Sequence, residues 1–381
     1  MDNVFELNIE KMTSQGFGLG FQEGKAIFVP FAYPEEIHRI EITEDKKSHA
    51  FARSMEIIKK RDERRNPVCP LFQTCGGCQF QDVTYNYQLK IKKEILEESL
   101  LRIGKLKTQV NDVIPSDGEF RYRNKGSFQV KNLQMGYCYP GTTKVFFFKE
   151  CALLDNSIEN HVKTLTGDES LNELKNINIR SNMKGEIIDS RTNNAFFIDE
   201  YAGLKFIVDI NAFFQVNKTI VPKWLEYIRS LVQETDRYAV DLYCGIGIIA
   251  QTIAGKTAKV SGIEINKRQI KQAEECLKMN GINNVEFISA DAENFLEHSG
   301  KHIDLLVINP PRVGMSKWLI RDIIDNPVSH IIYSSCNPDT FARDAGRLEE
   351  GGFKLVSVQP FDMFPQTHHL ELVGNFIFEG E

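Results

Sequence analysis

The sequence lacks several features that would place it in a specialised class of protein. It contains no apolar run long enough to span a bilayer, which takes about 20 residues, and this excludes a protein with transmembrane helices. Its first residues, MDNVFELNIEKM, have neither a basic start nor an apolar core, so we expect no secretory signal and a cytoplasmic protein. It has no internal repeat and no low-complexity segment, which excludes repeat architectures.

The chain also lacks the positive excess that is typical of nucleic-acid-binding proteins, because its formal net charge is −6. The charge is unevenly distributed, however. Residues 45–65 hold eight Lys or Arg against four Asp or Glu, and residues 121–131 hold four basic residues and no acidic one. Charge alone favours solvated faces for both runs, so an RNA partner needs support from sequence motifs.

The chain is long enough for several domains. Its 381 residues are more than one hydrophobic core usually holds, and its 42% hydrophobic residues are typical of a globular protein. Residues 1–60 predict a small β-barrel, because short strands such as 16–21 and 26–31 flank a glycine-containing turn. We expect a helix at about 85–103, a β-rich stretch at 110–210, and a doubly wound parallel sheet from about 216.

A glycine-rich turn, VDLYCGIG at residues 240–247, ends a predicted strand and opens a helix. Such turns bind dinucleotides or S-adenosylmethionine, but the dinucleotide pattern GxGxxG is not met here. The next strand ends in Glu264, suited to ribose hydroxyls, and the third ends near Asp291, suited to an adenine amino group. The fourth ends in NPPR at 309–312. Two acids followed by NPP at successive strand ends indicate a methyltransferase.

A thiol and a carboxylate are the candidates for chemistry. Cys336 lies in SSCNP at 334–338, just past a strand, where the Asn-Pro turn would present its thiol. The segment FPQTHHLE at 364–371 offers Glu371 and two histidines before the last strand. The alternatives are that Cys336 is a small buried residue and that His368 and His369 are ordinary surface or core residues.

Taken together, DLYCGIG, NPPR, SSCNP and FPQTHHLE, with FFQVN at 213–217, resemble the RNA (uracil-5-)methyltransferase family of the RlmD and TrmA type. The resemblance covers nearly the whole chain. It implies an α/β protein with an OB-like TRAM barrel at 1–60, a central β-rich iron–sulfur domain at 61–210 and a C-terminal Rossmann-like class I methyltransferase domain at 211–381. It implies transfer of a methyl group from S-adenosylmethionine to carbon 5 of a uridine in RNA.

The resemblance also assigns roles to individual residues. Cys336 would add to carbon 6 of uracil, which makes carbon 5 nucleophilic, and Glu371 would then remove the carbon-5 proton. His369 is a candidate to orient Glu371. The expected cofactor contacts are Gln215, Asp241, Tyr243, Gly245, Glu264, Asp291 and Asn309.

Asn309 departs from the family, which usually has Asp at this position. An amide can accept a hydrogen bond from uracil N3–H and donate one to O4, so uracil recognition is expected to survive. The change affects the rate and the discrimination between bases more than the fold.

Eight cysteines are present, and four of them form a pattern. Cys69, Cys75 and Cys78 lie close together, and Cys151 lies far downstream. Four thiolates fit zinc or an iron–sulfur cluster equally well. The resemblance to the 23S rRNA branch of the family implies a [4Fe-4S] cluster on these four residues, with Cys138 as the competitor for the fourth position.

The expected partner is RNA, bound by a monomer. The basic stretches at 59–65 and 121–125 would contact phosphates, and the target uridine would leave its stack. The barrel and the four cysteines favour 23S rRNA. Three alternatives remain: a tRNA uracil-5-methyltransferase, an RNA cytosine-5-methyltransferase and a non-catalytic RNA-binding protein. NPPR lacks the cysteine that cytosine-5 enzymes place beside the proline motif.

Overall fold

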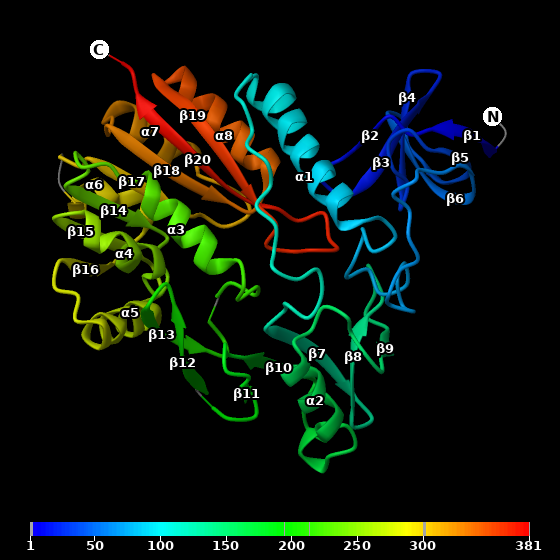
Figure 1. Ribbon diagram of the computed structural model, residues 1–381, viewed down its shortest axis with the longest axis horizontal. Coiled ribbons are helices and arrows are strands. Elements are labelled where there is room, and N and C mark those ends of the chain that lie inside the picture. Colours follow the sequence, from blue (N-terminus) through cyan, green and yellow to red (C-terminus); the bar gives the residue numbers. More distant parts are fainter. Residues whose placement is uncertain (1–2, 194, 213, 300–301, 381) are drawn as a thin grey trace.

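A computed structural model describes residues 3–193, 195–212, 214–299 and 302–380. Three β-rich parts surround a central helix, α1 (Tyr85–Ser99) (Figure 1). A sheet from the start of the chain lies at one end, a seven-stranded sheet lies at the other, and a five-stranded sheet lies beside both. Within these ranges, no helix combines the length and the apolar character needed to cross a membrane.

The N-terminal part is a six-stranded sheet, so the prediction of a β-rich start is confirmed. Its strand order is β1 (Val4–Asn8), β5 (Ile37–Asp45), β6 (His49–Lys59), β4 (Lys25–Pro30), β3 (Phe17–Gln22) and β2 (Lys11–Met12). The predicted turn at 22–24 joins β3 to β4. Leu7, Val29 and Ile40 are among the apolar side chains of its small core.

The central part combines α1 with a second sheet. The helix expected at 85–103 is confirmed, and α1 continues into a π-helical turn, η1 (Leu100–Gly104). The sheet order is β11 (Ile187–Asp189), β10 (Asn176–Ser181), β7 (Lys125–Lys131), β8 (Gln134–Cys138) and β9 (Val145–Phe147). Helix α2 (Asn156–Leu165) covers it with Ile158 and Val162, and the short helix η2 (Glu169–Leu171) follows.

The hairpin of β12 (Phe196–Tyr201) and β13 (Leu204–Asp209) packs away from this central sheet. Its Phe197 and Phe206 belong to the same apolar core as Trp224 in α3 (Val221–Leu231). The domain boundary that the sequence analysis predicts at residue 210 would assign this hairpin to the central domain, whereas its apolar side chains pack in the core that contains α3. Alternating burial in a strand shows that one face is covered, but it does not show which element covers it.

The second half of the chain forms a seven-stranded sheet, which confirms the predicted alternation of strands and helices. Its order is β16 (Val285–Ser289), β15 (Lys259–Glu264), β14 (Tyr238–Leu242), β17 (Leu305–Ile308), β18 (His330–Ser335), β20 (Glu371–Phe378) and β19 (Phe353–Phe361). The first five strands in this order, from β16 to β18, are parallel to one another, and β20 runs antiparallel to both of its neighbours.

Helices cover both faces of this sheet (Figure 1). Val240 and Leu242 belong to one apolar core, while Ala239 of the same strand belongs to another, as expected for a strand buried on both faces. The helices are α3, α4 (Ile248–Ile253), η3 (Ala254–Lys256), α5 (Lys267–Asn280), η4 (Ala292–Asn294), α6 (Phe295–Ser299), α7 (Lys317–Asp325) and α8 (Pro338–Glu350).

Candidate active site

The carboxyl ends of four parallel strands gather most of the expected cofactor residues. Leu242 at the end of β14 pairs with Ile263 of β15 and with Ile308 of β17. The side chains that follow these strands therefore meet at one edge of the sheet, which is where ligands bind in doubly wound folds. This edge holds Tyr243, Gly245, Glu264, Asp291 and Asn309.

The glycine-rich turn is closely packed at this edge. Gly245 and Gly247 have positive φ values of 57° and 76°. A Cβ atom at Gly247 would lie 2.2 Å from the ring of Phe287, so only glycine fits there. The Glu264 carboxylate accepts hydrogen bonds from the backbone N–H of Gly245 (3.2 Å) and of Asn266 (2.8 Å). The turn and the ribose-binding candidate are thus held together.

Asp241 is fully buried at the base of this turn. Its Oδ2 accepts a hydrogen bond from Ala250 N (3.0 Å), whereas its Oδ1 has no partner among the described residues. Burial, with a contribution from the charge of Glu264, raises the pKa of Asp241 to about 8. An unsatisfied acceptor and several carboxylates suit the hydroxyl and amino donors of S-adenosylmethionine.

Tyr243 at this edge and Gln215, which precedes α3, complete the set of predicted cofactor contacts. Burial raises the pKa of Tyr243 to about 12, and the charges of Glu293 and Asp291 add to this. Gln215 is buried, and its side chain makes no hydrogen bond with the described residues. Its neighbour Asn217 donates to the carbonyl of Met363 (3.2 Å), while Phe213 of the same motif lies outside the described residues.

Cys336 and Glu371 face each other at the same end of the sheet. Ser335 of β18 pairs with Leu372 of β20, so one further step along both strands places Cys336 opposite Glu371. Burial raises the pKa of the Cys336 thiol to about 11; the charge of Glu371 adds to this, and the charge of Arg312 opposes it. A half-buried thiol beside a buried carboxyl group is an arrangement suited to covalent catalysis.

The side chain that holds Glu371 is Ser334. Glu371 is 2% exposed, and burial raises its pKa to about 7, although the hydrogen bond from Ser334 Oγ (2.9 Å) lowers it. The sequence reasoning missed Ser334. The period of two along a strand could have identified it, because residues 334 and 336 share one face.

The structure shows no hydrogen bond between His369 and Glu371 among the described residues, so the orienting role of His369 stays a prediction. His369 Nδ1 lies 3.0 Å from an Arg312 nitrogen, and His368 Nδ1 lies 3.2 Å from Gln79 Oε1. Burial, together with nearby positive charges, lowers the pKa of His369 to about 3 and that of His368 to about 4. Both rings are therefore neutral near pH 7.

The segment that precedes Glu371 is held by distant parts of the chain. In Figure 1 it is the red loop that leaves the seven-stranded sheet and approaches α1. The carbonyl of Gln366 accepts hydrogen bonds from Gln79 N (2.9 Å) and Phe80 N (3.0 Å), directly after the last clustered cysteine. Lys92 of α1 pairs with Asp362 and donates to the carbonyl of Phe364 (3.0 Å). The cysteine segment and α1 thus position the segment that precedes Glu371.

Five of the cysteines, Cys69, Cys75, Cys78, Cys138 and Cys151, line a common cavity of about 400 Å³ together with apolar residues and with polar ones such as Gln81 and Arg123. Burial raises the pKa of the Cys78 thiol to about 12, and the charges of Cys151, Cys75 and Cys69 add to it. In the described parts of the chain, no three His, Cys, Asp or Glu side chains are arranged to hold a single metal ion. The fold therefore brings the four predicted ligands together without arranging them around one ion.

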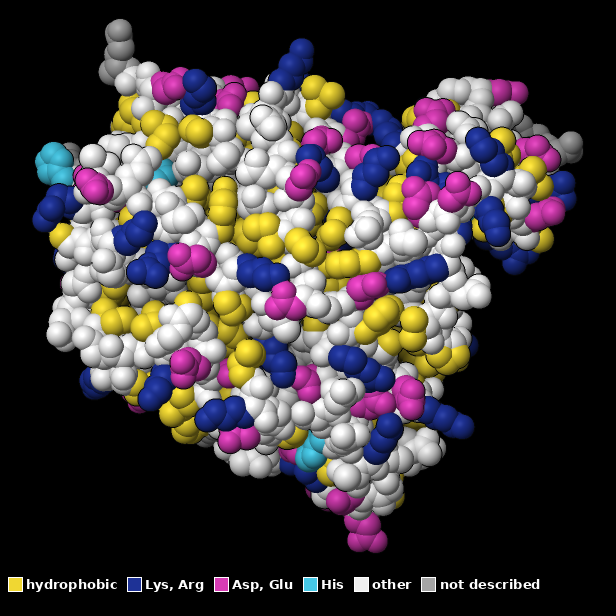
Figure 2. All heavy atoms as spheres, in the orientation of Figure 1, with side chains coloured by type: hydrophobic (Ala, Val, Ile, Leu, Met, Phe, Trp, Pro, Cys, Tyr) yellow, Lys and Arg dark blue, Asp and Glu magenta, His cyan; other side chains and the backbone are white. Residues whose placement is uncertain are grey.

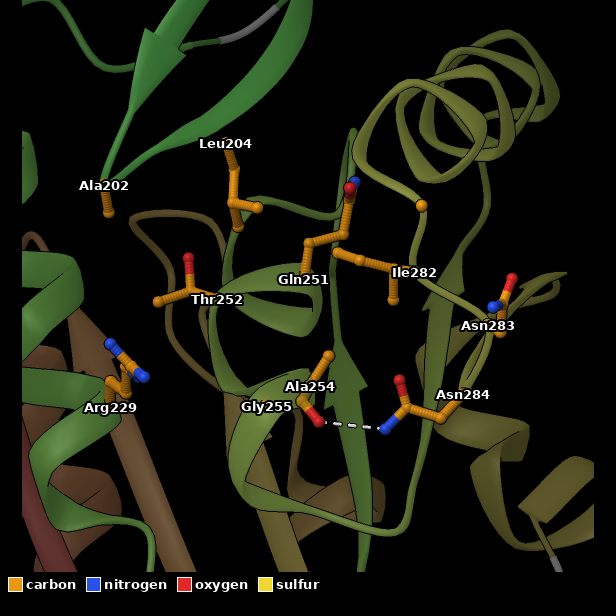
Figure 3. Close-up of a pocket in the computed structure, with 11 residues that line it drawn as sticks. Ala202, Leu204, Arg229, Gln251, Thr252, Ala254, Gly255, Ile282, Asn283 and Asn284 are labelled. Carbon is orange, nitrogen blue, oxygen red and sulfur yellow. Dashed lines mark hydrogen bonds between the residues drawn. The ribbon is translucent and has the colours of Figure 1, made fainter.

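Another hollow, of about 600 Å³, lies at the opposite edge of the seven-stranded sheet (Figure 3). Gly255 precedes β15 and Asn284 precedes β16, so these lining residues mark the amino ends of the strands. Leu204 of the β12–β13 hairpin closes another side. None of the predicted cofactor residues lines this hollow, so it is distinct from the candidate active site.

The basic runs offer fewer free charges to RNA than their composition suggests. Arg61 pairs with Glu63, Arg64 pairs with Glu36 and Asp82, Arg65 pairs with Glu119, and Arg121 pairs with Glu159. Figure 2 shows basic and acidic side chains interspersed over the face in view. Arg123, by contrast, is exposed and has no carboxylate partner among the described residues.

The fold is shared with a solved enzyme. The crystal structure of Pyrococcus abyssi tRNA (uracil-54, C5)-methyltransferase in complex with S-adenosyl-L-homocysteine superposes with a TM-score of 0.77. The match covers 98% of this chain and 100% of that one, at 22% sequence identity. This match shows that the two chains share a fold.

Sequence comparisons show the family of this chain. The tRNA (Uracil-5-)-methyltransferase family matches residues 154–377. Uncharacterized RNA methyltransferases of Aquifex aeolicus (strain VF5) and Bacillus cereus (strain ATCC 14579) are 30% and 31% identical. Both matches cover 98% of this chain, with 98% and 96% of the relatives' lengths. The chain belongs to this family and is an RNA methyltransferase of the uracil-5 type.

Proposed function

We propose that this enzyme methylates carbon 5 of a specific uridine in RNA, acting as a monomer, through a covalent adduct between Cys336 and carbon 6. The observation that carries the proposal is the placement of Cys336 opposite Glu371 at the cofactor edge of the sheet. A thiol and a buried carboxyl group supply the two functions that the reaction needs, a nucleophile and a base.

In this mechanism, the Cys336 thiolate adds to carbon 6, and the electron pair of the C5–C6 double bond moves toward the O4 carbonyl. The positive charge of Arg312 favours the thiolate, since it lowers the pKa of Cys336. S-adenosylmethionine supplies the methyl group, which carbon 5 takes up. The Glu371 carboxylate then accepts the carbon-5 proton, the double bond re-forms, and the sulfur leaves as a thiolate.

Asn309 is the proposed contact for the uracil edge. It follows β17 at the cofactor edge, and its backbone N–H lies 3.4 Å from the carbonyl of Leu242. Its amide oxygen can accept from N3–H while its amino group donates to O4. Asp241, Tyr243, Gly245, Glu264 and Asp291 are proposed cofactor contacts, supported by their common edge and by the unsatisfied oxygen of Asp241. Gln215 is proposed as a further cofactor contact on the resemblance to the family.

We propose 23S rRNA as the substrate, on the resemblance of the four-cysteine segment and the TRAM-like N-terminal sheet to that branch of the family. The tRNA (uracil-54, C5)-methyltransferase of Pyrococcus abyssi shares this fold over 98% of the chain, so tRNA is the alternative that the experiment must separate from rRNA. The deciding experiment maps 5-methyluridine by mass spectrometry in rRNA and tRNA from a strain that lacks the protein.

Loss of 5-methyluridine at one 23S rRNA position, restored by the intact gene but not by a Cys336→Ala variant, is the expected result. A missing modification in tRNA would transfer the proposal to that substrate. The proposed activity would be contradicted if 5-methylcytidine were lost instead, or if no modified base were lost.

We further propose a [4Fe-4S] cluster on Cys69, Cys75, Cys78 and Cys151. The support is the common cavity that these four thiols line. The cluster has no step in methyl transfer, which requires no electron transfer. Its place next to Gln79 and Phe80, which bind the loop before Glu371, favours a structural role.

Anaerobic purification followed by iron, sulfide and zinc analysis tests the cluster. We expect about four irons and four sulfides per chain, by the composition of such a cluster, and their loss in Cys78→Ser and Cys151→Ser. Cys138→Ser is the matched control, because it borders the same cavity and is expected to keep the iron. Stoichiometric zinc without iron would reject the iron–sulfur assignment and retain the cysteine site.

A further inference from the structure

Glu371 is attached to a buried network that the proposed mechanism leaves without a role. Ser334 Oγ lies 2.9 Å from Glu371 Oε1, and Trp224 Nε1 lies 3.2 Å from Ser334 Oγ. Trp224 belongs to α3, which is 110 residues earlier in the chain. Trp224 and Ser334 are fully buried, and Glu371 is 2% exposed, so water does not compete for these contacts.

The direction of each hydrogen bond in this network follows from its chemistry. An indole N–H is only a donor, so the Ser334 oxygen must accept from Trp224. A hydroxyl group has a single hydrogen, and the remaining polar partner of Ser334 Oγ is Glu371, so this hydrogen points at the carboxylate. Trp224 thereby fixes Ser334 as a donor to Glu371.

We propose that Trp224 and Ser334 are positioning residues, which together fix the direction of the Glu371 carboxylate and favour its charged form. This inference rests on the proposed role of Glu371 as the base. The charged form is the one that accepts the carbon-5 proton, so the network would accelerate the release of product from Cys336 rather than methyl transfer itself.

The groups around the carboxylate allow the effect of pH to be derived. Cys336 follows β18, Arg312 follows β17 and His369 lies in the loop before β20. Two neutral residues lie next to Glu371: Ser334, which Trp224 of α3 contacts, and Phe361 of β19, its strand partner. Burial raises the pKa of Glu371 to about 7, and the Ser334 hydrogen bond lowers it. Removing this bond therefore raises the pKa, and the base becomes active at a higher pH.

The test measures two rates in single-turnover experiments on the full chain, across pH. One rate is methyl transfer into the covalent adduct, and the other is decay of that adduct to free RNA. The variants are Ser334→Ala, Ser334→Cys, Ser334→Thr and Trp224→Phe. Ser261→Ala is the matched control, because Ser261 is also fully buried and donates to a glutamate, Glu286, but lies on β15 away from Cys336.

For Ser334→Ala we expect the midpoint of adduct decay to move up by about one pH unit, with decay roughly 10-fold slower on the acidic side. At high pH the decay should approach the wild-type rate and fall short of it only by the effect of the lost orientation, and methyl transfer into the adduct should be unaffected. The pH profile of adduct decay should be close to the wild-type profile in Ser334→Thr, and in Ser334→Cys it should lie between those of the wild type and Ser334→Ala. In Trp224→Phe the midpoint should also move up, but by less than in Ser334→Ala. Ser261→Ala should leave it in place.

A Ser334→Ala profile that superimposes on the wild type would contradict the inference, and so would equal slowing at every pH. Ser334→Cys keeps the side-chain volume and weakens the donor, so it provides the same test if the alanine variant does not fold. Normal turnover by Glu371→Gln would instead reject Glu371 as the base, which separates a failure of the proposed function from a failure of this network.

Discussion

Replacing Glu371 by Gln is expected to stall the enzyme with methylated RNA attached to Cys336. In the proposed mechanism the base acts after methyl transfer, so the variant should complete the first bond-forming steps and fail to remove the carbon-5 proton. Removing a positioned base costs about 100-fold to 10,000-fold in rate, so the adduct should accumulate within one turnover. A denaturing gel with a labelled methyl group on the cofactor would show protein, RNA and label in one band.

The matched control for this variant is Glu286→Gln. Glu286 also accepts a hydrogen bond from a buried serine, but it lies on β16 and pairs with Lys259. We expect this variant to turn over and leave no stable adduct. If Glu371→Gln turned over at the wild-type rate, another group would be the base; the lowered pKa of His369 makes that ring available as a neutral acceptor.

Replacing Cys336 by Ala is expected to abolish both the adduct and the product. Carbon 5 of uracil is a poor nucleophile until a thiolate has added to carbon 6, so no methyl group should reach the RNA. We expect activity to fall by at least about 1000-fold, because a covalent nucleophile has no substitute in the site. Non-covalent binding of RNA and of the cofactor should persist.

Cys276→Ala is the control for the loss of a thiol. Cys276 is buried in α5 and accepts a hydrogen bond from Ile207 N, far along the chain from β18. We expect this variant to methylate RNA. Methylation of uridine by Cys336→Ala would mean that the methyl group is transferred directly, and Asn309 would then be the side chain to examine for a role in catalysis.

The sequence predicts the parallel sheet and the positions of the strand-end motifs because both depend on local patterns. Runs such as LLVI in β17 and HIIYSS in β18 are buried throughout, and polar motifs follow them directly. Residues that follow neighbouring parallel strands must meet at one edge. For this reason the order of strands and motifs along the chain is sufficient to group Glu264, Asp291 and Asn309.

The contacts that hold these side chains could not be predicted in the same way. Ser334 and Trp224 are 110 residues apart, and Lys92 and Asp362 are 270 residues apart, so no local pattern joins them. The sequence predicts that Arg64 contacts RNA, yet in the fold its guanidinium group pairs with Glu36 and Asp82. Such pairs depend on how distant elements pack, which a run of residue types does not encode.

The most direct test of the covalent mechanism is mass spectrometry of the Glu371→Gln adduct after digestion with protease and nuclease. The mechanism predicts one modified peptide, which contains Cys336 and carries a uridine residue joined through carbon 6, with one additional methyl group at carbon 5. A peptide modified at another cysteine, or an adduct without the transferred methyl group, would contradict the central claim that Cys336 is the nucleophile and Glu371 the base.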